Sequence, residues 1–200
     1  MSNIEQIPLF PLGLVLLPFE ELPLHIFEPR YKKMILNAIN YNKPFGIVLN
    51  DSNSIYKIGC KAKVSKVLKT FPDGKSNIIV KGISRFEITK TFLEDQTIIG
   101  KVKMLIDEKI NNDKLINEIH ENYLKILLKI GNTNFMDQDL KKKISYEFIQ
   151  NILLPVNIKK QLISKNDEKD RIKIINKLFI KILRVPFVTA SGKLSTMLQS

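Results

Sequence analysis

The sequence predicts an α+β fold, in which a mostly antiparallel β lobe over residues 1–106 precedes a helical lobe over residues 107–186. Two observations support this division. Over residues 45–106 apolar and polar side chains alternate, as they do in strands with one buried face. In the second lobe apolar side chains recur at three- and four-residue spacing, which is the pattern of helices packed on one side. Residues 187–200 show neither period, and we expect a flexible tail there.

Two short strands, at residues 7–10 and 23–27, are expected before an early helix. Pro29 would occupy the first helical turn, where its missing N–H is not needed. The helix is marked by one apolar stripe, whose members are Tyr31, Met34, Ile35, Ala38 and Ile39. Pro44 prevents its continuation.

The rest of the first lobe is expected to be strands and turns. The strand candidates are residues 45–49, 60–64, 77–81, 86–88 and 100–106. A turn is expected at Phe71–Gly74, and Gly82 is expected to interrupt a strand, serving a bulge. Half a dozen short strands with one early helix predict a compact, mostly antiparallel barrel or sandwich.

Four helices are expected in the second lobe, over residues 115–130, 140–152, 157–164 and 167–183. Gly131 stands where a residue just beyond a helix end adopts the left-handed conformation. Acidic residues near Asp167 suit the start of the last helix, because its dipole is positive there.

Composition limits the function classes. The net charge of +12 is carried by 32 basic residues, only four of which are arginines (Arg30, Arg85, Arg171 and Arg184). Nucleic-acid sites favour arginine, so we interpret the charge mainly as a solvated lysine surface. The apolar run over residues 7–19 is too short and too interrupted by prolines for a signal peptide or a membrane helix. We therefore expect a cytoplasmic protein with no membrane partner.

Motifs for catalysis or cofactor binding are absent from the sequence. The only histidines, His25 and His120, stand in no metal-binding motif, and no glycine-rich phosphate loop is present. The single cysteine, Cys60, falls at an alternating strand position, where burial is expected. We expect no cofactor, no metal and no enzymatic activity; a small hydrolase using Cys60 or His25 is the remaining catalytic alternative.

A series of motifs carries a family resemblance. Its members are Ile7-Pro8-Leu9-Phe10-Pro11-Leu12, Leu17-Pro18, Leu22–Tyr31, Phe45–Leu49, Ile58-Gly59-Cys60, Asp73-Gly74 and Val80–Ile88. This series resembles the N-terminal, substrate-binding domain of Lon proteases, particularly the short bacterial proteins that carry this domain without the ATPase and protease domains. The resemblance covers about residues 6–106, and it is looser in the helical half. The sequence departs from the family pattern in its lysine and asparagine content and at Ile172 and Phe179, where leucines are commoner.

The resemblance implies a PUA-like β pseudobarrel followed by a C-terminal α-helical bundle. It also implies a protein- or peptide-binding module for unfolded or extended polypeptide, with an adaptor role beside a cellular AAA+ protease in protein quality control. The alternative is an RNA-binding PUA-like protein. Peptide could add to an exposed sheet edge or enter an apolar groove between the lobes.

The candidate binding or motif residues are Pro11, Leu12, Pro18, His25, Phe27, Glu28, Arg30, Arg85 and Phe86. We expect Phe10, Phe27 and Phe86 to lie in the core rather than to form a binding platform. Glu28 stands at the helix entrance, and the fork of Arg85 suits a bidentate partner. We therefore hypothesise a Glu28–Arg85 ion pair; the alternative is two unrelated solvated charges.

Overall fold

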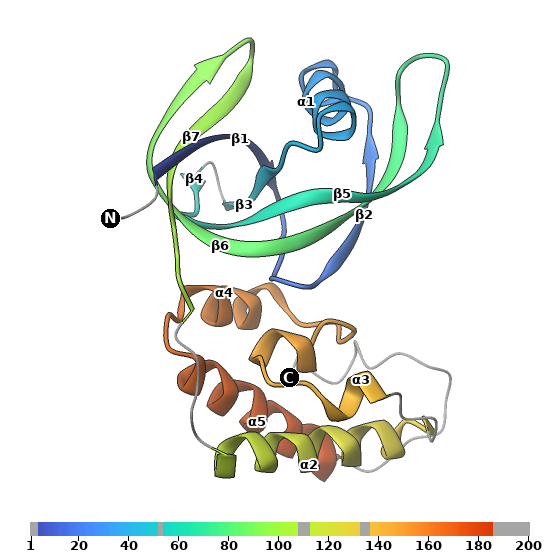
Figure 1. The fold of residues 1–200 in the computed structure, drawn as a ribbon, viewed down its shortest axis with the longest axis vertical. Coiled ribbons are helices and arrows are strands. Elements are labelled where there is room, and N and C mark those ends of the chain that lie inside the picture. The colour runs from blue at the N-terminus through green and yellow to red at the C-terminus, as the bar shows by residue number, and fades with distance from the viewer. Residues whose placement is uncertain (1–3, 52–53, 108–112, 133–136, 186–200) are drawn as a thin grey trace. The chain divides into compact units, whose positions relative to one another are not determined.

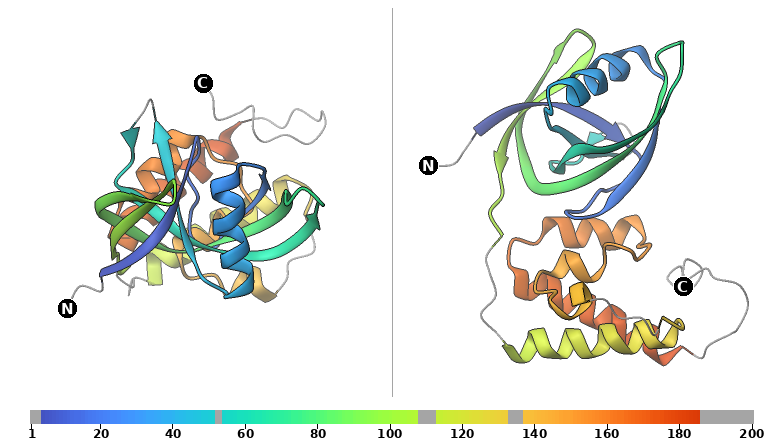
Figure 2. Two further views of the ribbon diagram at one scale, coloured as in Figure 1. Left: turned by 90° about the horizontal axis from the view of Figure 1, so that it is seen from above. Right: turned by 45° about the vertical axis from the view of Figure 1, so that its right-hand side comes forward.

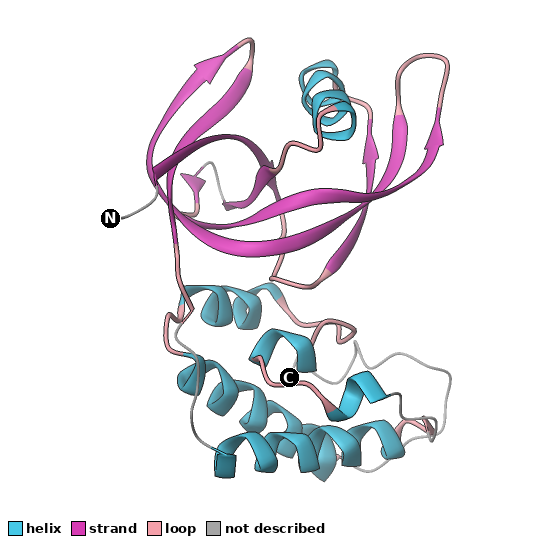
Figure 3. Cartoon of the chain, viewed as in Figure 1, coloured by secondary structure: helices cyan, strands magenta, loops and turns pink. Residues whose placement is uncertain are grey.

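The protein is described from a computed structural model, which covers residues 4–51, 54–107, 113–132 and 137–185. The contacts within the chain form two compact units, residues 1–106 and residues 107–200. The strands lie in the first unit together with one helix, and the second unit is helical (Figure 3). The tail expected at residues 187–200 lies outside the described residues.

Seven strands form the sheet of the first unit: β1 (Ile4–Leu12), β2 (Glu21–Ile26), β3 (Phe45–Asp51), β4 (Ser54–Ile55), β5 (Ile58–Thr70), β6 (Ser76–Glu94) and β7 (Thr97–Met104). β1 pairs antiparallel with β7 and parallel with β3. The path β1-β7-β6-β5-β3 therefore returns to its first strand and closes (Figures 1 and 2). This arrangement confirms the mostly antiparallel pseudobarrel. β5 and β6 are much longer than the short strands expected, and β6 runs through Gly82 without ending.

Gly82 allows a close backbone crossing. A Cβ at this position would stand 2.2 Å from the carbonyl oxygen of Leu17, which no side chain can tolerate. The Gly82 N–H donates to the Glu20 carbonyl at 3.0 Å, and the Phe19 N–H donates to the Gly82 carbonyl at 3.0 Å. A register shift between β5 and β6 lies directly beside it, at Lys61/Ala62. The expected bulge is therefore present, and the glycine also admits the neighbouring chain.

The barrel core follows the predicted pattern. β3 is buried continuously over Phe45–Leu49, and Cys60 and Ala62 are fully buried on β5. Phe86 fills the space above two glycines, since a Cβ on Gly46 or Gly59 would collide with its ring. This core holds β1, β3, β6 and β7 together at its centre.

β2 is an outer strand, because among the described residues it pairs only with β6. The Gly82 N–H donates to the Glu20 carbonyl, so the backbone of Glu20 faces β6. In an antiparallel pair every second residue of a strand faces the partner strand in this way. Leu22 and Leu24 consequently direct their backbone groups towards β6, whereas Pro23 directs its backbone away. Proline has no N–H, so the outer edge of β2 lacks a donor at its middle.

Helix α1 (Pro29–Asn40) is amphipathic, as predicted, with Pro29 in its first turn. Its buried side chains are Tyr31, Met34, Ile35 and Ala38. Two adjacent lysines connect it to two hairpins, between which it lies in Figures 1 and 2. Lys32 Nζ donates to the Asp73 carbonyl in the β5–β6 turn at 2.7 Å, and Lys33 Nζ donates to Asp95 Oδ2 in the β6–β7 turn at 2.8 Å.

The second unit contains α2 (Asp113–Lys129), α3 (Asp137–Leu140), the 3₁₀ turn η1 (Ser145–Phe148), α4 (Val156–Ser164) and α5 (Glu168–Arg184). Gly131 ends α2 as predicted, with a φ of 78°. Its N–H donates to the Leu128 carbonyl and that of Asn132 to the Leu127 carbonyl, which is the paired hydrogen bonding of a Schellman end. Asp167 caps α5 through its side chain.

The single helix expected over residues 140–152 is wrong. Only α3 and η1 form in this region, and Leu140 and Ile144, members of the supposed stripe, are exposed. A buried polar network replaces the helix. The Glu168 carboxylate accepts hydrogen bonds from the Ser145 N–H and, at 2.9 Å, from Ser145 Oγ, and it pairs with the fully buried Arg171. Tertiary hydrogen bonds to Ser145 thus override the local helical spacing.

Candidate functional site

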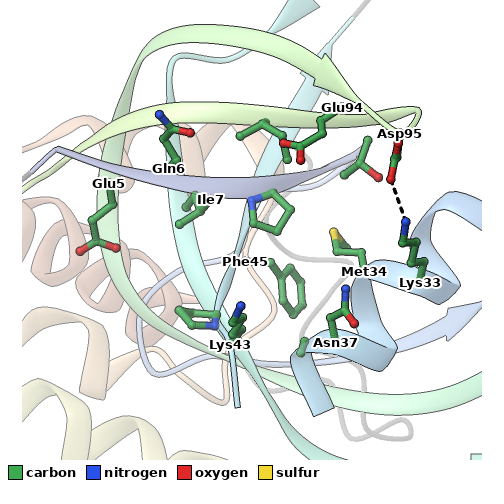
Figure 4. A pocket seen from close by; sticks show the side chains of 15 residues that line it. Glu5, Gln6, Ile7, Lys33, Met34, Asn37, Lys43, Phe45, Glu94 and Asp95 are labelled. Atoms are coloured by element: carbon green, nitrogen blue, oxygen red, sulfur yellow. Dashed lines mark hydrogen bonds and ion pairs between the residues drawn. The ribbon is translucent and has the colours of Figure 1, made fainter. Parts of the chain in front are cut away.

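A pocket of about 570 Å³ opens in the first unit beside α1. Its walls come from four separate segments: the start of β1, α1, the start of β3 and the β6–β7 hairpin (Figure 4). Its apolar lining consists of Ile7, Pro8, Met34, Ala38, Pro44, Phe45 and Ile99. Ile7, Met34 and Phe45 belong to the core, so core side chains form the apolar floor of the pocket.

Charges of both signs surround this floor. Lys33 and Asp95 pair at 2.8 Å, and Glu5 pairs with Lys61 of β5 at 2.5 Å. The hydrogen bond to Asp95 raises the pKa of Lys33, and the same bond lowers the pKa of Asp95. Glu94 also lines the pocket, and its charge contributes to the raised pKa of Lys33. The rim can therefore offer a carboxylate to a ligand.

The turn that carries Asp95 has an unusual backbone. Asp95 and Gln96 have φ values of 47° and 64°, so both occupy the left-handed region. Two consecutive residues of this kind form the tight two-residue turn whose twist suits an antiparallel hairpin. Glu94 and Thr97 pair across it. This turn holds Asp95 over α1, within reach of Lys33.

No metal-binding cluster and no exposed thiol occur among the described residues. Among the described residues no cluster of three or more histidine, cysteine, aspartate or glutamate side chains could hold a metal ion. Cys60 is fully buried, and its burial raises the pKa of the thiol to about 12. Burial and a raised pKa both disfavour Cys60 as a nucleophile at neutral pH. In the described part of the chain, no helix combines the length and apolarity needed to cross a membrane.

The residues singled out from the sequence do not line this pocket. Pro11 and Leu12 are half-buried at the end of β1, where they pair with β3, and Pro18 is buried beyond it. Phe86 is fully buried, as expected for a core residue. Of these four residues only Phe86 belongs to the hydrophobic core cluster of the barrel.

The position of Phe27 differs from the sequence prediction. It was expected in the core, yet 56% of it is exposed. Its ring stacks on His25, with ring centroids 5.9 Å apart, and His25 in turn contacts the edge of Phe71 at 6.2 Å. His25 Nδ1 also lies 2.6 Å from Asn77 Oδ1. An exposed aromatic cluster therefore forms where β2 ends.

The expected Glu28–Arg85 pair is also corrected. The Glu28 carboxylate accepts two hydrogen bonds from Arg30, at 3.0 and 2.7 Å, on the exposed side of α1. Arg85 is fully buried on β6 opposite Cys60. Arg85 and Glu20 both act electrostatically on the Cys60 thiol. The guanidinium group of Arg85 therefore lies in the interior of the barrel. Glu28 instead pairs with Arg30, two residues further along the chain.

The residues that make the pocket were not identified from the sequence. Met34 was interpreted only as part of a helical stripe, and Glu94 and Asp95 were assigned no role. One feature of the sequence could have located part of the pocket. The alternation of apolar and polar residues is interrupted at Asp95, which indicates a hairpin there. No local sequence pattern predicted that the barrel closes through β1 and so brings β1 beside this hairpin.

Comparisons with known proteins agree with this fold. The family model described as the ATP-dependent protease La (LON) substrate-binding domain matches residues 6–181. A Lon protease of Parabacteroides distasonis is 27% identical over 199 residues, covering 92% of this chain. A Lon protease of Bacillus thuringiensis is 26% identical over 151 residues, covering 67% of this chain. The chain spans only 24% and 19% of the length of these two relatives.

Two solved structures share the fold. The Lon N-terminal domain protein from Xanthomonas campestris superimposes with a TM-score of 0.65 at 19% identity, covering 86% of this chain and 97% of that one. The N-terminal domain of the Mycobacterium avium complex Lon protease gives a TM-score of 0.70 at 15% identity, covering 88% and 98%. Because the family model spans most of the chain, the protein belongs to the Lon substrate-binding domain family.

Proposed function

We propose that the protein is a non-catalytic cytoplasmic module that binds extended segments of unfolded polypeptide in the pocket beside α1. The observation that carries this proposal is the pocket's composition, an apolar floor with charges of both signs at its rim. Such a site accepts one apolar side chain, while its polar rim meets the peptide backbone and neighbouring charges. The family description, a substrate-binding domain, supports the same conclusion.

The pocket is a better candidate than strand addition at β2. Strand addition requires a row of backbone donors and acceptors along an open edge. Pro23 removes one donor from the middle of that edge, and His25 and Phe27 crowd its end with rings. Pocket binding needs neither an open edge nor a change of register.

Filling the pocket tests the proposal. Asn37 is exposed on α1 and lines the pocket, whereas Asn40 is exposed on the same helix and does not. Asn37→Trp should fill the mouth and weaken binding of reduced, carboxymethylated lactalbumin at least tenfold, measured by fluorescence anisotropy. Asn40→Trp is the matched control and should bind as the unmodified chain does. Equal binding by all three proteins would rule out the pocket as the site.

The adaptor role has a separate test. If the chain delivers unfolded clients to an AAA+ protease, adding it to the purified cellular Lon should accelerate ATP-dependent degradation of labelled carboxymethylated lactalbumin. Asn37→Trp should abolish this acceleration, and Asn40→Trp should retain it. No acceleration at saturating chain concentration would contradict the adaptor role, while leaving peptide binding to be judged by the anisotropy measurement.

A further inference from the structure

β2, β6 and β5 form a three-stranded ribbon with one solvent-facing side, which we call the outer ribbon face. The strand registers define its rows: His25 pairs with Asn77 and Asn77 with Lys69; Pro23 with Ile79 and Ile79 with Lys66; Glu21 with Lys81 and Lys81 with Lys63. Residues paired in this way direct their side chains to the same face. The alternate positions, such as Ile26, Ile78 and Val80, are buried. The outer ribbon face is therefore a continuous surface of known composition.

The charge on this face has one dominant sign. It carries four lysines, Lys63, Lys66, Lys69 and Lys81, and a single carboxylate, Glu21. Lys63, Lys66 and Lys69 are exposed along β5. These three are spaced along one strand by two bulges, at Val64/Lys66 and Val67/Lys69, which keep all of them on the solvent side. The surface thus offers a track of positive charge to an extended polyanion.

Aromatic rings stand at the end of the same face. Phe27 and His25 stack, Phe71 meets His25 edge-on, and Lys69 lies over the Phe71 ring at 4.7 Å. The contact with Asn77 holds the His25 ring in place. Phe27 presents more than half of its surface to solvent. An apolar ring exposed beside lysines offers a face on which a planar group can stack.

We propose that the outer ribbon face binds single-stranded RNA. Lysines along β5 would follow the phosphates, and Phe27 and Phe71 would stack on unpaired bases. Charge alone would attract any polyanion, including an acidic peptide. The rings distinguish the two, because bases have flat faces to stack and acidic side chains do not.

The test uses a labelled mixed-sequence single-stranded RNA of about 16 nucleotides, titrated with the full chain at several salt concentrations. Phe27→Ala should weaken binding about tenfold, through loss of one stacked base. The combined Lys66→Gln and Lys69→Gln variant should reduce the slope of log K against log salt by about 0.7 for each lost phosphate contact. Since Phe27 is exposed, circular dichroism should find the variant folded.

Two control variants lie on the β6–β7 hairpin. Leu93→Ala removes an exposed apolar side chain, and Lys90→Gln removes an exposed lysine; both should leave RNA binding unchanged. Absence of binding by the unmodified chain would overturn the proposal. So would loss of binding in the lysine variant with none in Phe27→Ala, or full competition by poly-glutamate, because either result describes a polyanion surface. Asn37→Trp should bind RNA normally, which separates this site from the pocket.

Discussion

The α-carbon of Gly82 and the carbonyl oxygen of Leu17 approach so closely that a methyl group at residue 82 would lie 2.2 Å from that oxygen. Both atoms belong to the backbone, so no side-chain rotation can relieve the contact. Gly82→Ala should therefore lower the free energy of unfolding by about 1–3 kcal/mol or more. Urea denaturation followed by circular dichroism measures this change. Gly13→Ala is the control, since a Cβ there meets no atom within 4 Å; an equal loss in both variants would refute the steric explanation.

The β6–β7 turn predicts a stabilising substitution. Gln96 has a φ of 64°, a conformation that costs an L-residue about 1–2 kcal/mol and glycine almost nothing. Gln96→Gly should raise the urea midpoint, although greater freedom of the unfolded chain offsets part of the gain. Thr91→Gly, on extended backbone of the same hairpin, should lower it. A lower midpoint for Gln96→Gly would contradict the assigned turn.

Cys60 predicts a dependence of stability on alkaline pH. The pKa of the thiol is raised from an ordinary value of 9.0 to about 12 by burial. Below pH 9 both folded and unfolded states keep the proton, so the contribution is fully present. Between pH 9 and about 12 only the unfolded state loses it, and stability should fall by about 1.4 kcal/mol per pH unit.

Comparison with Cys60→Ala isolates this effect, because alanine carries no titrating group. The difference between the two denaturation free energies should be constant below pH 9 and should change above it. A thiol reagent such as dithiobisnitrobenzoate should also modify Cys60 only after unfolding in urea. Rapid modification of the native chain at pH 8 would show that the thiol is accessible.

The buried network in the second unit predicts a large loss of stability. Arg171 is fully buried, and its Nε donates to Glu168 at 2.9 Å while its Nη1 lies 2.9 Å from Asp107. Glu168→Gln removes one of its compensating charges, and breaking a buried pair in this way costs about 3–5 kcal/mol. Lys173→Gln removes a solvent-exposed partner 4.0 Å from Asp170 and should change stability by less than about 1 kcal/mol. Similar losses in both variants would argue against the network.

Local periodicity predicted most of the fold because most elements bury one regular face. The stripe of α1, the continuous burial of Phe45–Leu49 and the end of α2 at Gly131 were all visible in the sequence. The prediction for the region around Ser145 failed for a physical reason. Apolar residues four apart matched the spacing of a helix, but the backbone there is held by hydrogen bonds to Glu168.

The candidate site was less predictable than the fold. The pocket depends on closure of the barrel through β1, and no local pattern encodes a pairing between strands so far apart. Phe27 was misassigned because alternation along β2 indicates two faces without saying which one is buried. Glu28 and Arg85 were paired on chemistry alone, whereas the helix gave Glu28 a nearer partner in Arg30.

Lys32 and Lys33 attach α1 to two different hairpins. One lysine bonds to the turn beside Phe71, and the other bonds to the turn above the pocket. Because Lys32 and Lys33 are consecutive residues near the start of α1, the same part of the helix is attached to both hairpins. The β5–β6 and β6–β7 turns thereby share one anchor, two consecutive side chains of a single helix.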